Sequence, residues 1–385
     1  MKLKNICIIT YEYPSKKRMA YTFLEQLVNE FTDLGINCHV IVPQSISRNI
    51  LRGFKINKRK YNRITSNNNI VKVYSPYHLT YGKKHINKNL KNYIKSTDKI
   101  YKKLTKKIKF DAIYAHFIFP AGICACELKN KYNVPAFLAY GEHSDYTINY
   151  FGKEKTKEML SNIDGVISVS TENKNRLIEN DIFNESVVDV FPNAINDKVF
   201  YKKNKNEMRE KLNINKNDFV IAFVGRFIER KGIDRLCQAL NAINGDNIKA
   251  IFIGAGDIKP NYKNIIFEGE LDQKLIVDYL SAGDIFVLPT NSEGCCNAII
   301  EALACGLPVV SSNKSFNDDI LNDNCSLRID TMNIDEIKNA ILKLYNDDML
   351  RKKLELGALN QASKLNISNR AKNIIKYIEN RINNK

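Results

Sequence analysis

The sequence predicts an α/β fold of two tandem, doubly wound, Rossmann-like domains. Short apolar runs alternate with helical patterns along all 385 residues, and such strand–helix repeats form parallel sheets that are covered on both faces. The chain is long enough for two hydrophobic cores. The pattern restarts near Phe219 after a Lys- and Asn-rich stretch, 196–218, which we expect to be a linker. The expected domains are therefore 1–195 and 196–367, followed by a basic helix, 368–385, that packs back on the first domain.

The expected strands are apolar runs rich in β-branched and aromatic residues. In the first domain we place them at 6–10, 38–42, 70–74, 112–115, 135–139, 165–170 and 187–191. In the second domain they lie at 219–225, 248–253, 264–267, 285–288 and 308–311. Between them, apolar residues three and four apart indicate helices, for example at 22–34, 232–243, 273–282 and 297–305.

The composition is that of a globular protein, with 44% hydrophobic residues. No stretch stays apolar for the roughly 18 residues that suggest a transmembrane helix, so we expect a soluble or at most peripheral protein. The nine cysteines do not form two close pairs at the spacing of zinc ligands. They are typical of reduced thiols in a cytoplasmic protein.

The net charge of +17 comes from one segment of the first half. Residues 48–109, here called the basic segment, contain 19 Lys or Arg and a single acid, Asp98, which gives a net charge of +18. From Ile86 this segment reads helical, with Leu90, Tyr101 and other apolar residues near one face and lysines over the rest. A basic patch this local predicts an anionic partner. We expect an anionic membrane surface, on the inner face of the cytoplasmic membrane, rather than nucleic acid, because no nucleic-acid-binding module is present.

A first motif, VGRFIERKG, runs from Val224 to Gly232. It follows an expected strand and begins a helix, so Gly225 allows the backbone a tight turn close to a ligand. Arg226 and Lys231 lie across that turn, where both can reach one anion, and the helix N-terminus adds backbone donors. The arrangement fits a diphosphate, and the plain alternative is a basic surface turn.

A second motif, PTNSEGCCNAIIE, runs from Pro289 to Glu301 and again joins a strand to a helix. Glu293 precedes the helix, and Glu301 lies about one turn inside it. A carboxylate on the helix can accept hydrogen bonds from both hydroxyls of a ribose, and the amides of residues 294–297 can hold a phosphate. Each acid alone is common near a helix N-terminus, but the spacing of the two favours a nucleotide site.

Together, GRFIERKG and the later string SEGCCNAIIEALACGLPVV resemble the retaining glycosyltransferases of family 4. The resemblance covers nearly the whole chain. It implies the GT-B architecture, in which two Rossmann-like domains face each other across a cleft. It also implies transfer of a sugar from a nucleotide-sugar, with UDP-sugar expected and GDP-sugar as the alternative. The implied acceptor is a glycan or a lipid-linked glycan in the synthesis of a cell-surface polysaccharide.

The resemblance implies roles for individual residues of the donor site. Arg226 and Lys231 would neutralise the donor diphosphate. Glu301 would bind the ribose, and Glu293 would lie beside the transferred sugar. The rest of the implied donor site consists of glycines, a residue near the nucleobase and the first residues of the second helix: Gly225, Gly254, Gly256, Leu271, Gly294, Cys295, Cys296 and Asn297.

On the acceptor side, the family usually places a His in the loop after the strand at 135–139. Here the loop reads YGEHSD and needs one extra residue, so Glu142 and His143 are alternative candidates for contact with the transferred sugar or the acceptor. We include His143 among the catalytic candidates. His116, which also ends a strand, either lines the acceptor side or caps the next helix, and Asp145 completes the set.

Three features depart from the family pattern. Ala194 replaces Gly in the Pro-Asn-Gly turn, and Cys295 stands where an aromatic residue is frequent. The N-terminal loop carries Lys16, Lys17 and Arg18 in place of glycines, which predicts an anion contact there. None of these changes removes a charged donor residue, so we expect an active enzyme.

The implied chemistry is transfer with retention at the anomeric carbon. Arg226 and Lys231 would stabilise the charge on the departing diphosphate. No Asp-x-Asp metal motif appears near a strand end, so no metal ion is expected, and no further cofactor is expected either. Gly254 and Gly256 lack the third glycine of a dinucleotide fingerprint, which argues against a nicotinamide cofactor. Two alternatives are a UDP-sugar 2-epimerase of the same architecture and a nucleotide-sugar-binding pseudoenzyme.

Overall fold

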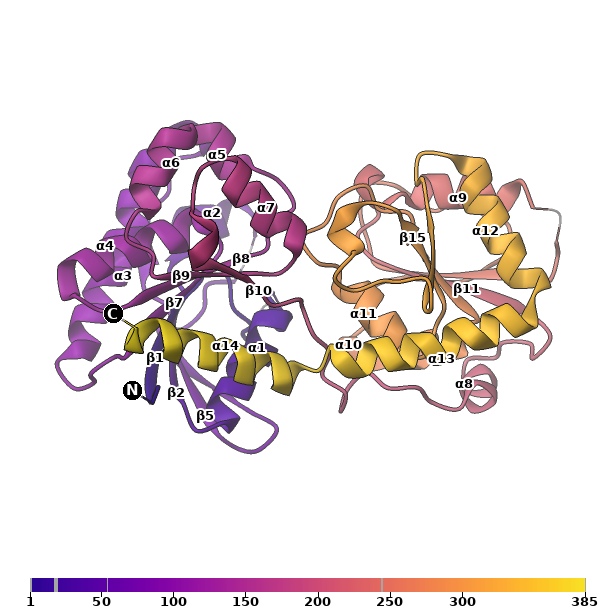
Figure 1. The fold of residues 1–385 in the computed structure, drawn as a ribbon, viewed down its shortest axis with the longest axis horizontal. Helices are drawn as coiled ribbons and strands as arrows, with labels where there is room; N and C mark the ends of the chain where they lie inside the picture. The colour runs from indigo at the N-terminus through magenta and orange to yellow at the C-terminus, as the bar shows by residue number, and fades with distance from the viewer. Residues whose placement is uncertain (1, 17–19, 54, 244, 385) are drawn as a thin grey trace. The chain divides into compact units, whose positions relative to one another are not determined.

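The computed structural model of the protein describes residues 2–16, 20–53, 55–243 and 245–384. The chain divides into two compact units, each built around a mostly parallel β-sheet with helices on its faces (Figure 1). Unit 1 comprises residues 1–169, 173–191 and 368–385, and unit 2 comprises residues 170–172 and 192–367. The α/β class and the parallel sheets are as the sequence predicts.

The sheet of unit 1 has eight strands in the order β10-β9-β8-β7-β1-β2-β5-β4, and the strand order reverses between β1 and β7. Cys7 and Ile9 of β1 belong to one core, and Ile6 and Ile8 belong to another, so apolar residues cover both faces of the sheet. The strands are β1 (Asn5–Ile9), β2 (Asn37–Ile41), β4 (Lys60–Ile64), β5 (Ile70–Tyr74), β7 (Ala112–His116), β8 (Ala136–Tyr140), β9 (Gly165–Ser168) and β10 (Val188–Val190).

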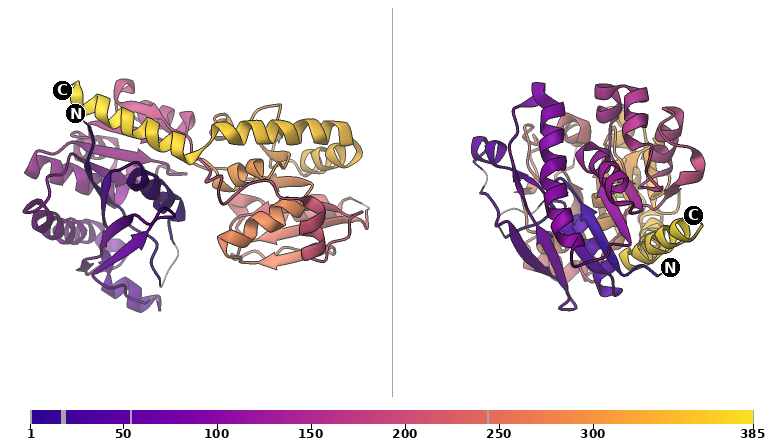
Figure 2. Two further views of the ribbon diagram at one scale, coloured as in Figure 1. Left: turned by 90° about the horizontal axis from the view of Figure 1, so that it is seen from below. Right: turned by 90° about the vertical axis from the view of Figure 1, so that its left-hand side faces the viewer.

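Helices cover both faces of this sheet. They are α1 (Thr22–Asp33), α2 (Ile46–Leu51), α3 (Ile86–Thr105), α4 (Ile123–Tyr132), α5 (Tyr146–Phe151), α6 (Lys153–Leu160), α7 (Thr171–Glu179) and α14 (Ile367–Asn383). The C-terminal helix α14 runs along unit 1 (Figure 2). Its Tyr377 hydroxyl accepts from the Val166 amide at 3.1 Å and donates to the Val187 carbonyl at 2.7 Å, which ties α14 to β9 and to the residue just before β10.

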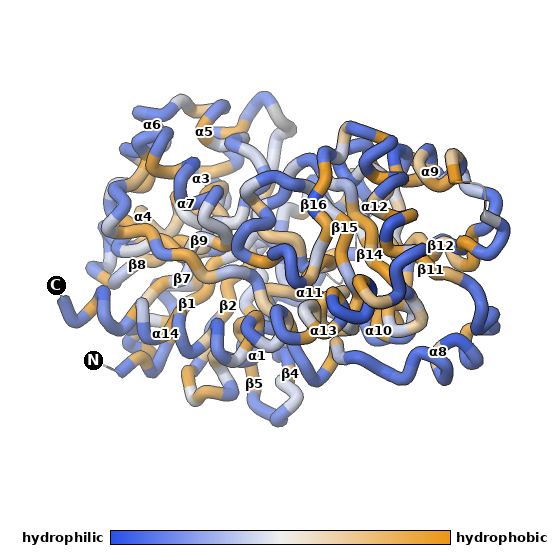
Figure 3. The backbone as a smooth tube through the Cα atoms, turned by 45° about the vertical axis from the view of Figure 1, so that its right-hand side comes forward, coloured by the Kyte–Doolittle hydropathy of each residue, from blue (hydrophilic) through white to orange (hydrophobic). Residues whose placement is uncertain are grey.

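The sheet of unit 2 is fully parallel, in the order β13-β12-β11-β14-β15-β16, with its reversal between β11 and β14. Its strands are β11 (Phe219–Val224), β12 (Ile248–Ile253), β13 (Ile265–Gly269), β14 (Ile285–Leu288), β15 (Val309–Ser312) and β16 (Ser326–Ile329). Its helices are α8 (Lys205–Lys211), α9 (Ile233–Asn241), α10 (Gln273–Ala282), α11 (Asn297–Ala304), α12 (Ile334–Asn346) and α13 (Asp348–Lys364). The strands β11, β12 and β14 are hydrophobic, whereas α8 is hydrophilic (Figure 3).

Several strands were not predicted from the sequence, because they lack a continuous apolar run. β4 pairs antiparallel with β5 at the edge of the sheet, and its residues alternate between exposed and half-buried. β16 is an edge strand of four residues, and β3 (Gln44–Ser45) and β6 (Tyr77–His78) form a separate pair of two residues each. Edge strands of this kind carry little of the burial signal on which a sequence prediction depends.

We expected the stretch 196–218 to be a linker, but it is part of unit 2. The buried Arg209 of α8 donates to the Ala282 carbonyl at 3.0 Å and to Asp284 at 2.7 Å. Lys203 and Lys211 both pair with Asp278. The composition was misleading because these cations are neutralised by acids about seventy residues further along the chain, a pairing that only the fold brings about.

Candidate functional site

Both charged motifs leave the sheet of unit 2 at the point where its strand order reverses. Residues 225–232 follow β11, and residues 289–297 follow β14, the neighbouring strand. In doubly wound sheets, ligands bind outside the carboxyl ends of the strands at this position. The fold therefore brings the two motifs to one ligand-binding position.

The two motifs also contact each other through their backbones. The Asn291 amide donates to the Arg230 carbonyl at 2.9 Å. Gly232 has a φ of +72°, and a Cβ on it would lie 2.2 Å from the Pro289 carbonyl oxygen. Glycine at 232 is thus required both by the backbone conformation and by the close approach of the second motif.

The glycines after β12 are required for the same kind of packing. Gly254 has a φ of +144°, and a Cβ there would lie 1.9 Å from the Gly225 carbonyl oxygen. A Cβ on Gly256 would lie 2.2 Å from the Phe227 carbonyl oxygen. Gly225 is different, because a Cβ on it would make only ordinary contacts, the nearest with Lys231 at 3.7 Å. We conclude that Gly254 and Gly256 let the two turns pack, whereas a side chain at 225 would make only ordinary contacts with Lys231 and Phe223.

A buried ion cluster joins the motifs. The Glu293 carboxylate lies 2.5 Å from the Lys231 ammonium and 3.1 Å from the Arg230 guanidinium, and it accepts from the Thr290 hydroxyl at 2.8 Å. Lys231 and Glu293 are only 9% and 8% exposed. Burial alone would raise the pKa of Glu293, but Lys231 and Arg230 outweigh it and hold that pKa below its ordinary value. Both members of the pair are therefore charged near neutral pH.

Arg230 is a cluster residue that the sequence interpretation did not select. It donates to the Ser292 carbonyl as well as facing Glu293. The available signal was its position beside Lys231 in a motif with three basic residues. Arg226, which we did select, is exposed and forms no ion pair within the described residues. The structure thus leaves the Arg226 guanidinium open to a ligand, while Arg230 and Lys231 share one carboxylate.

Glu301 is the fifth residue of α11, about one turn inside the helix. Burial raises the pKa of Glu301 to about 8, and the nearby Gln273 side chain at the start of α10 offsets part of this rise. α11 begins at Asn297, and no side-chain hydrogen bond caps it at Cys296. Its first-turn amides are therefore available to an anion, with Gly294 in the loop just before them.

The remaining donor candidates surround this helix start. Asn193 donates through its side chain to the Cys295 carbonyl at 3.0 Å and through its amide to the Cys295 sulfur at 3.3 Å. The turn with Ala194 therefore contacts the second motif through its asparagine. The Cys296 sulfur lies 4.0 Å from the Lys231 ammonium. Leu271, just after β13, is half-buried against the core of unit 2.

The acceptor-side candidates all lie in unit 1. Glu142 follows β8, accepts from the Ile118 amide at 2.9 Å, and has its pKa raised to about 8 by burial. His143 is exposed in the same loop, and Asp145 lies 3.5 Å from the Arg176 guanidinium. His116 is buried, neither ring nitrogen has a hydrogen-bond partner among the described residues, and burial lowers its pKa to about 3. This placement of His116 favours a packing role, and no side-chain hydrogen bond caps the helical turn that follows it.

Within residues 2–16, 20–53, 55–243 and 245–384, no three His, Cys, Asp or Glu side chains are placed to hold a metal ion. Over the same ranges, no helix is both long and apolar enough to span a bilayer. Lys17 and Arg18 of the N-terminal loop lie outside the described residues.

Comparison with known families gives two adjacent matches. The family model described as Glycosyltransferase Family 4 matches residues 20–199, and the model described as Glycosyl transferases group 1 matches residues 204–361. Among curated proteins, a glycosyltransferase of Bacillus subtilis, provisionally assigned to teichuronic acid biosynthesis, is 28% identical over 79% of this chain and 80% of its own. UDP-Gal:α-D-GlcNAc-diphosphoundecaprenol α-1,3-galactosyltransferase of Escherichia coli is 27% identical over 67% of this chain and 72% of its own.

Solved structures share the fold over the full length. Sucrose-phosphate synthase of Thermosynechococcus elongatus matches with a TM-score of 0.80 and 18% identity, covering 99% of this chain and 100% of that one. HepE of Anabaena, solved with UDP, matches with a TM-score of 0.75 and 15% identity, covering 98% and 100%.

Proposed function

Because this chain belongs to the family 4 glycosyltransferases and has their GT-B fold, we propose that it transfers a hexose from a UDP-sugar, with retention and without a metal ion, to a glycan or lipid-linked acceptor. The setting would be the synthesis of a cell-surface polysaccharide. The curated relatives support this proposal through their activities, which include a galactosyl transfer from UDP-Gal to a diphosphoundecaprenol-linked sugar.

The observation that carries the proposal is the charged cluster at the strand reversal of unit 2. A departing nucleoside diphosphate needs cations that are already in place. Arg226 is exposed there, and Lys231 is held charged beside Glu293. We propose that the diphosphate takes over part of the interaction that Lys231 now makes with Glu293, which then faces the transferred sugar. Glu301 would accept the ribose hydroxyls, and the first amides of α11 would hold a phosphate.

Incubation with a panel of radiolabelled UDP- and GDP-sugars tests the proposal. Slow donor hydrolysis or transfer supports a glycosyltransferase, formation of an epimer supports a 2-epimerase, and binding without turnover supports a pseudoenzyme. Lys231→Met should reduce hydrolysis by roughly 10²- to 10³-fold, the usual effect of removing one preorganised charge donor. Lys353→Met, at an exposed position of α13, is the matched control and should leave the rate unchanged.

Retention and metal independence have separate measurements. Proton NMR of the first-formed product should show the same anomeric configuration as the donor, and inversion would contradict the assignment. Turnover should persist in excess EDTA. A rate that EDTA abolishes and Mn²⁺ or Mg²⁺ restores would show that a metal takes part.

We further propose that the basic segment holds the enzyme on the inner face of the cytoplasmic membrane. The lysines of α3, among them Lys88, Lys95 and Lys102, are exposed. The one acid of the segment, Asp98, is already paired with Lys131 at 2.7 Å, outside the segment. Each such lysine near an anionic bilayer contributes about 1 kcal/mol. Sedimentation with liposomes should show binding that depends on anionic lipid, and equal binding to neutral vesicles would rule out this mode.

A further inference from the structure

Unit 1 contains two adjoining pockets at its own strand reversal, and no role has so far been assigned to them. The reversal lies between β1 and β7. Tyr11, which follows β1, lines both pockets, and Phe119 and Pro120, which follow β7, line one of them. This is the position at which doubly wound sheets bind ligands.

The larger pocket is mainly apolar. It has a volume of about 390 Å³, within the usual range for small-molecule sites. Its floor is built by α3, through Leu90 and Tyr93, and Tyr93 is fixed by donating to the Thr10 carbonyl at 2.9 Å. His78 in its wall is neutral near pH 7, because burial lowers its pKa to about 4. At the mouth, Leu51 is 86% exposed and Tyr146 is 58% exposed, so the apolar surface continues outward.

Two arginines line these pockets, and one of them, Arg48, lies at the boundary between the two. Arg48 lines both pockets, and Arg52, one turn further along the chain, lines the apolar one. The Arg48 guanidinium donates to the Tyr11 hydroxyl and lies 5.0 Å from the centre of its ring. Neither guanidinium pairs with a carboxylate of the described chain, and the residues that line the apolar pocket include no acid. Burial and the neighbouring Arg52 lower the pKa of Arg48, so an anion bound there would relieve an unfavourable environment.

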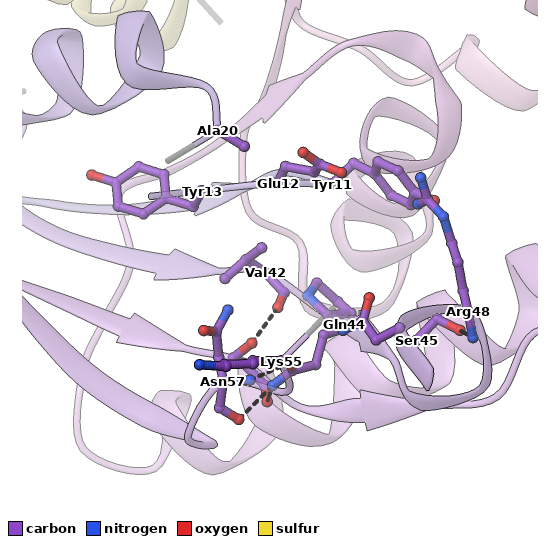
Figure 4. Close-up of a pocket in the computed structure, with 13 residues that line it drawn as sticks. Tyr11, Glu12, Tyr13, Ala20, Val42, Gln44, Ser45, Arg48, Lys55 and Asn57 are labelled. Carbon is purple, nitrogen blue, oxygen red and sulfur yellow. Dashed lines mark hydrogen bonds between the residues drawn. The ribbon is translucent and has the colours of Figure 1, made fainter. Parts of the chain in front are cut away.

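The smaller pocket is polar and has a volume of about 60 Å³. Figure 4 shows the Arg48 side chain reaching toward Tyr11 on one side, with Gln44, Lys55 and Asn57 on the other. Gln44 fixes this wall, since its side chain accepts from the Asn57 amide and donates to the Asn57 carbonyl, both at 2.9 Å. The pocket therefore offers preorganised hydrogen-bonding groups and a further cation, Lys55, together with one carboxylate, Glu12.

We propose that the two pockets together bind an amphipathic anion, with an apolar chain in the pocket over α3, a phosphate at Arg48 and Arg52, and a polar head group in the pocket beside Gln44. Charge complementarity selects the phosphate, and the continuous apolar lining selects a chain rather than a free phosphate ester. If the proposed function holds, this ligand is the sugar acceptor, and only that identification rests on the proposed function. The acceptor is then an apolar chain joined through phosphate to a polar head.

A single introduced tryptophan can report binding, because the chain contains none. We choose Tyr146→Trp at the pocket mouth and titrate this variant with dodecyl phosphate, dodecyl maltoside and inorganic phosphate. Both amphiphiles are kept below their critical micelle concentrations. We expect a saturable blue shift of the emission with dodecyl phosphate. Dodecyl maltoside should bind at least tenfold more weakly because it lacks the charge-assisted contact, and inorganic phosphate should give no shift.

Substitutions in the Tyr146→Trp background locate the site. Leu51→Asp should weaken dodecyl phosphate binding at least tenfold, and Arg52→Ala should reduce the preference for phosphate over maltoside. The controls are Leu356→Asp, at a 70% exposed leucine of unit 2, and Lys353→Ala, which removes the same charge from an exposed position of α13. Both should leave binding unchanged. Circular dichroism checks the folding of every variant.

Two results would overturn the inference. Equal affinity for the phosphate and maltoside amphiphiles would mean general detergent adsorption, and the absence of any shift would mean that the pocket binds neither. These failures are separable from failure of the proposed function. Donor hydrolysis without an acceptor can persist when dodecyl phosphate does not bind, and dodecyl phosphate can bind when no sugar nucleotide is turned over.

Discussion

The buried Lys231–Glu293 pair gives the sharpest prediction, because its members depend on each other. We consider Lys231→Met, Glu293→Gln and the double variant. Lys231→Met leaves the carboxylate of Glu293 with only Arg230, at 3.1 Å, as its cationic partner. Glu293→Gln leaves the ammonium of Lys231 buried beside a neutral amide. The double variant leaves neither charge of the pair.

The magnitude follows from burial and distance. Two unit charges 4 Å apart attract by about 4 kcal/mol at an effective dielectric constant of about 20, and here the two atoms are 2.5 Å apart. The desolvation of both groups offsets much of this attraction. Removing one partner of a buried pair costs about 3–5 kcal/mol, and Arg230 places Lys231→Met near the lower end. Removing both should cost about as much as either single change, which corresponds to a coupling energy of about 3–5 kcal/mol.

Urea denaturation followed by circular dichroism measures the three free energies of unfolding. The pKa of Glu293 is lower in the folded than in the unfolded protein. The pair's contribution to the free energy of unfolding is therefore present above the unfolded-state pKa of Glu293 and is lost as the pH falls through its folded-state pKa. The coupling should therefore be large at pH 7 and shrink toward acidic pH. Additivity of the two single changes within about 0.5 kcal/mol at pH 7 would refute the reasoning.

Three further predictions use other parts of the molecule. Glu301→Gln should weaken UDP binding by roughly 10-fold or more in isothermal titration, and because the pKa of Glu301 is raised to about 8, wild-type affinity should rise between pH 7 and pH 9 while that of the variant should not. Gly254→Ala should destabilise unit 2 by roughly 2–4 kcal/mol more than Gly269→Ala. Both glycines have a φ of +144°, but a Cβ would lie 1.9 Å from its nearest neighbour at 254 and 3.8 Å from it at 269. Equal thermal midpoints for the two variants would show that the close contact at 254 does not restrict the side chain. Burial raises the folded pKa of Glu142 to about 8, so its carboxyl binds a proton on folding and stability should fall as the pH rises from about 5 through 8; Glu142→Gln should flatten that fall in thermal melts, and an unchanged slope would contradict the shift.

The sequence by itself determined the fold class and most of its strands, because buried parallel strands are continuous apolar runs. It also determined the two motifs that meet in unit 2, since a glycine turn with basic residues and a pair of spaced acids are local features. The strands at 70–74, 248–253 and 285–288 begin and end where the structure has them. Edge strands such as β4 were not predicted, because their exposed residues do not form an apolar run.

Only the tertiary structure decided which charges meet. Arg230 looked like a neighbour of Lys231 in the chain, but folding turns it toward the same carboxylate, Glu293. The composition of 196–218 predicted a linker, but in the structure Arg209 of this stretch pairs with Asp284, 75 residues away. The pockets of unit 1 combine Tyr11, Arg48 and Phe119, which no local pattern links. Ion pairs and cavities depend on distances between segments far apart in the chain, and those distances are fixed by the packing of the sheets rather than by the residues near each charge.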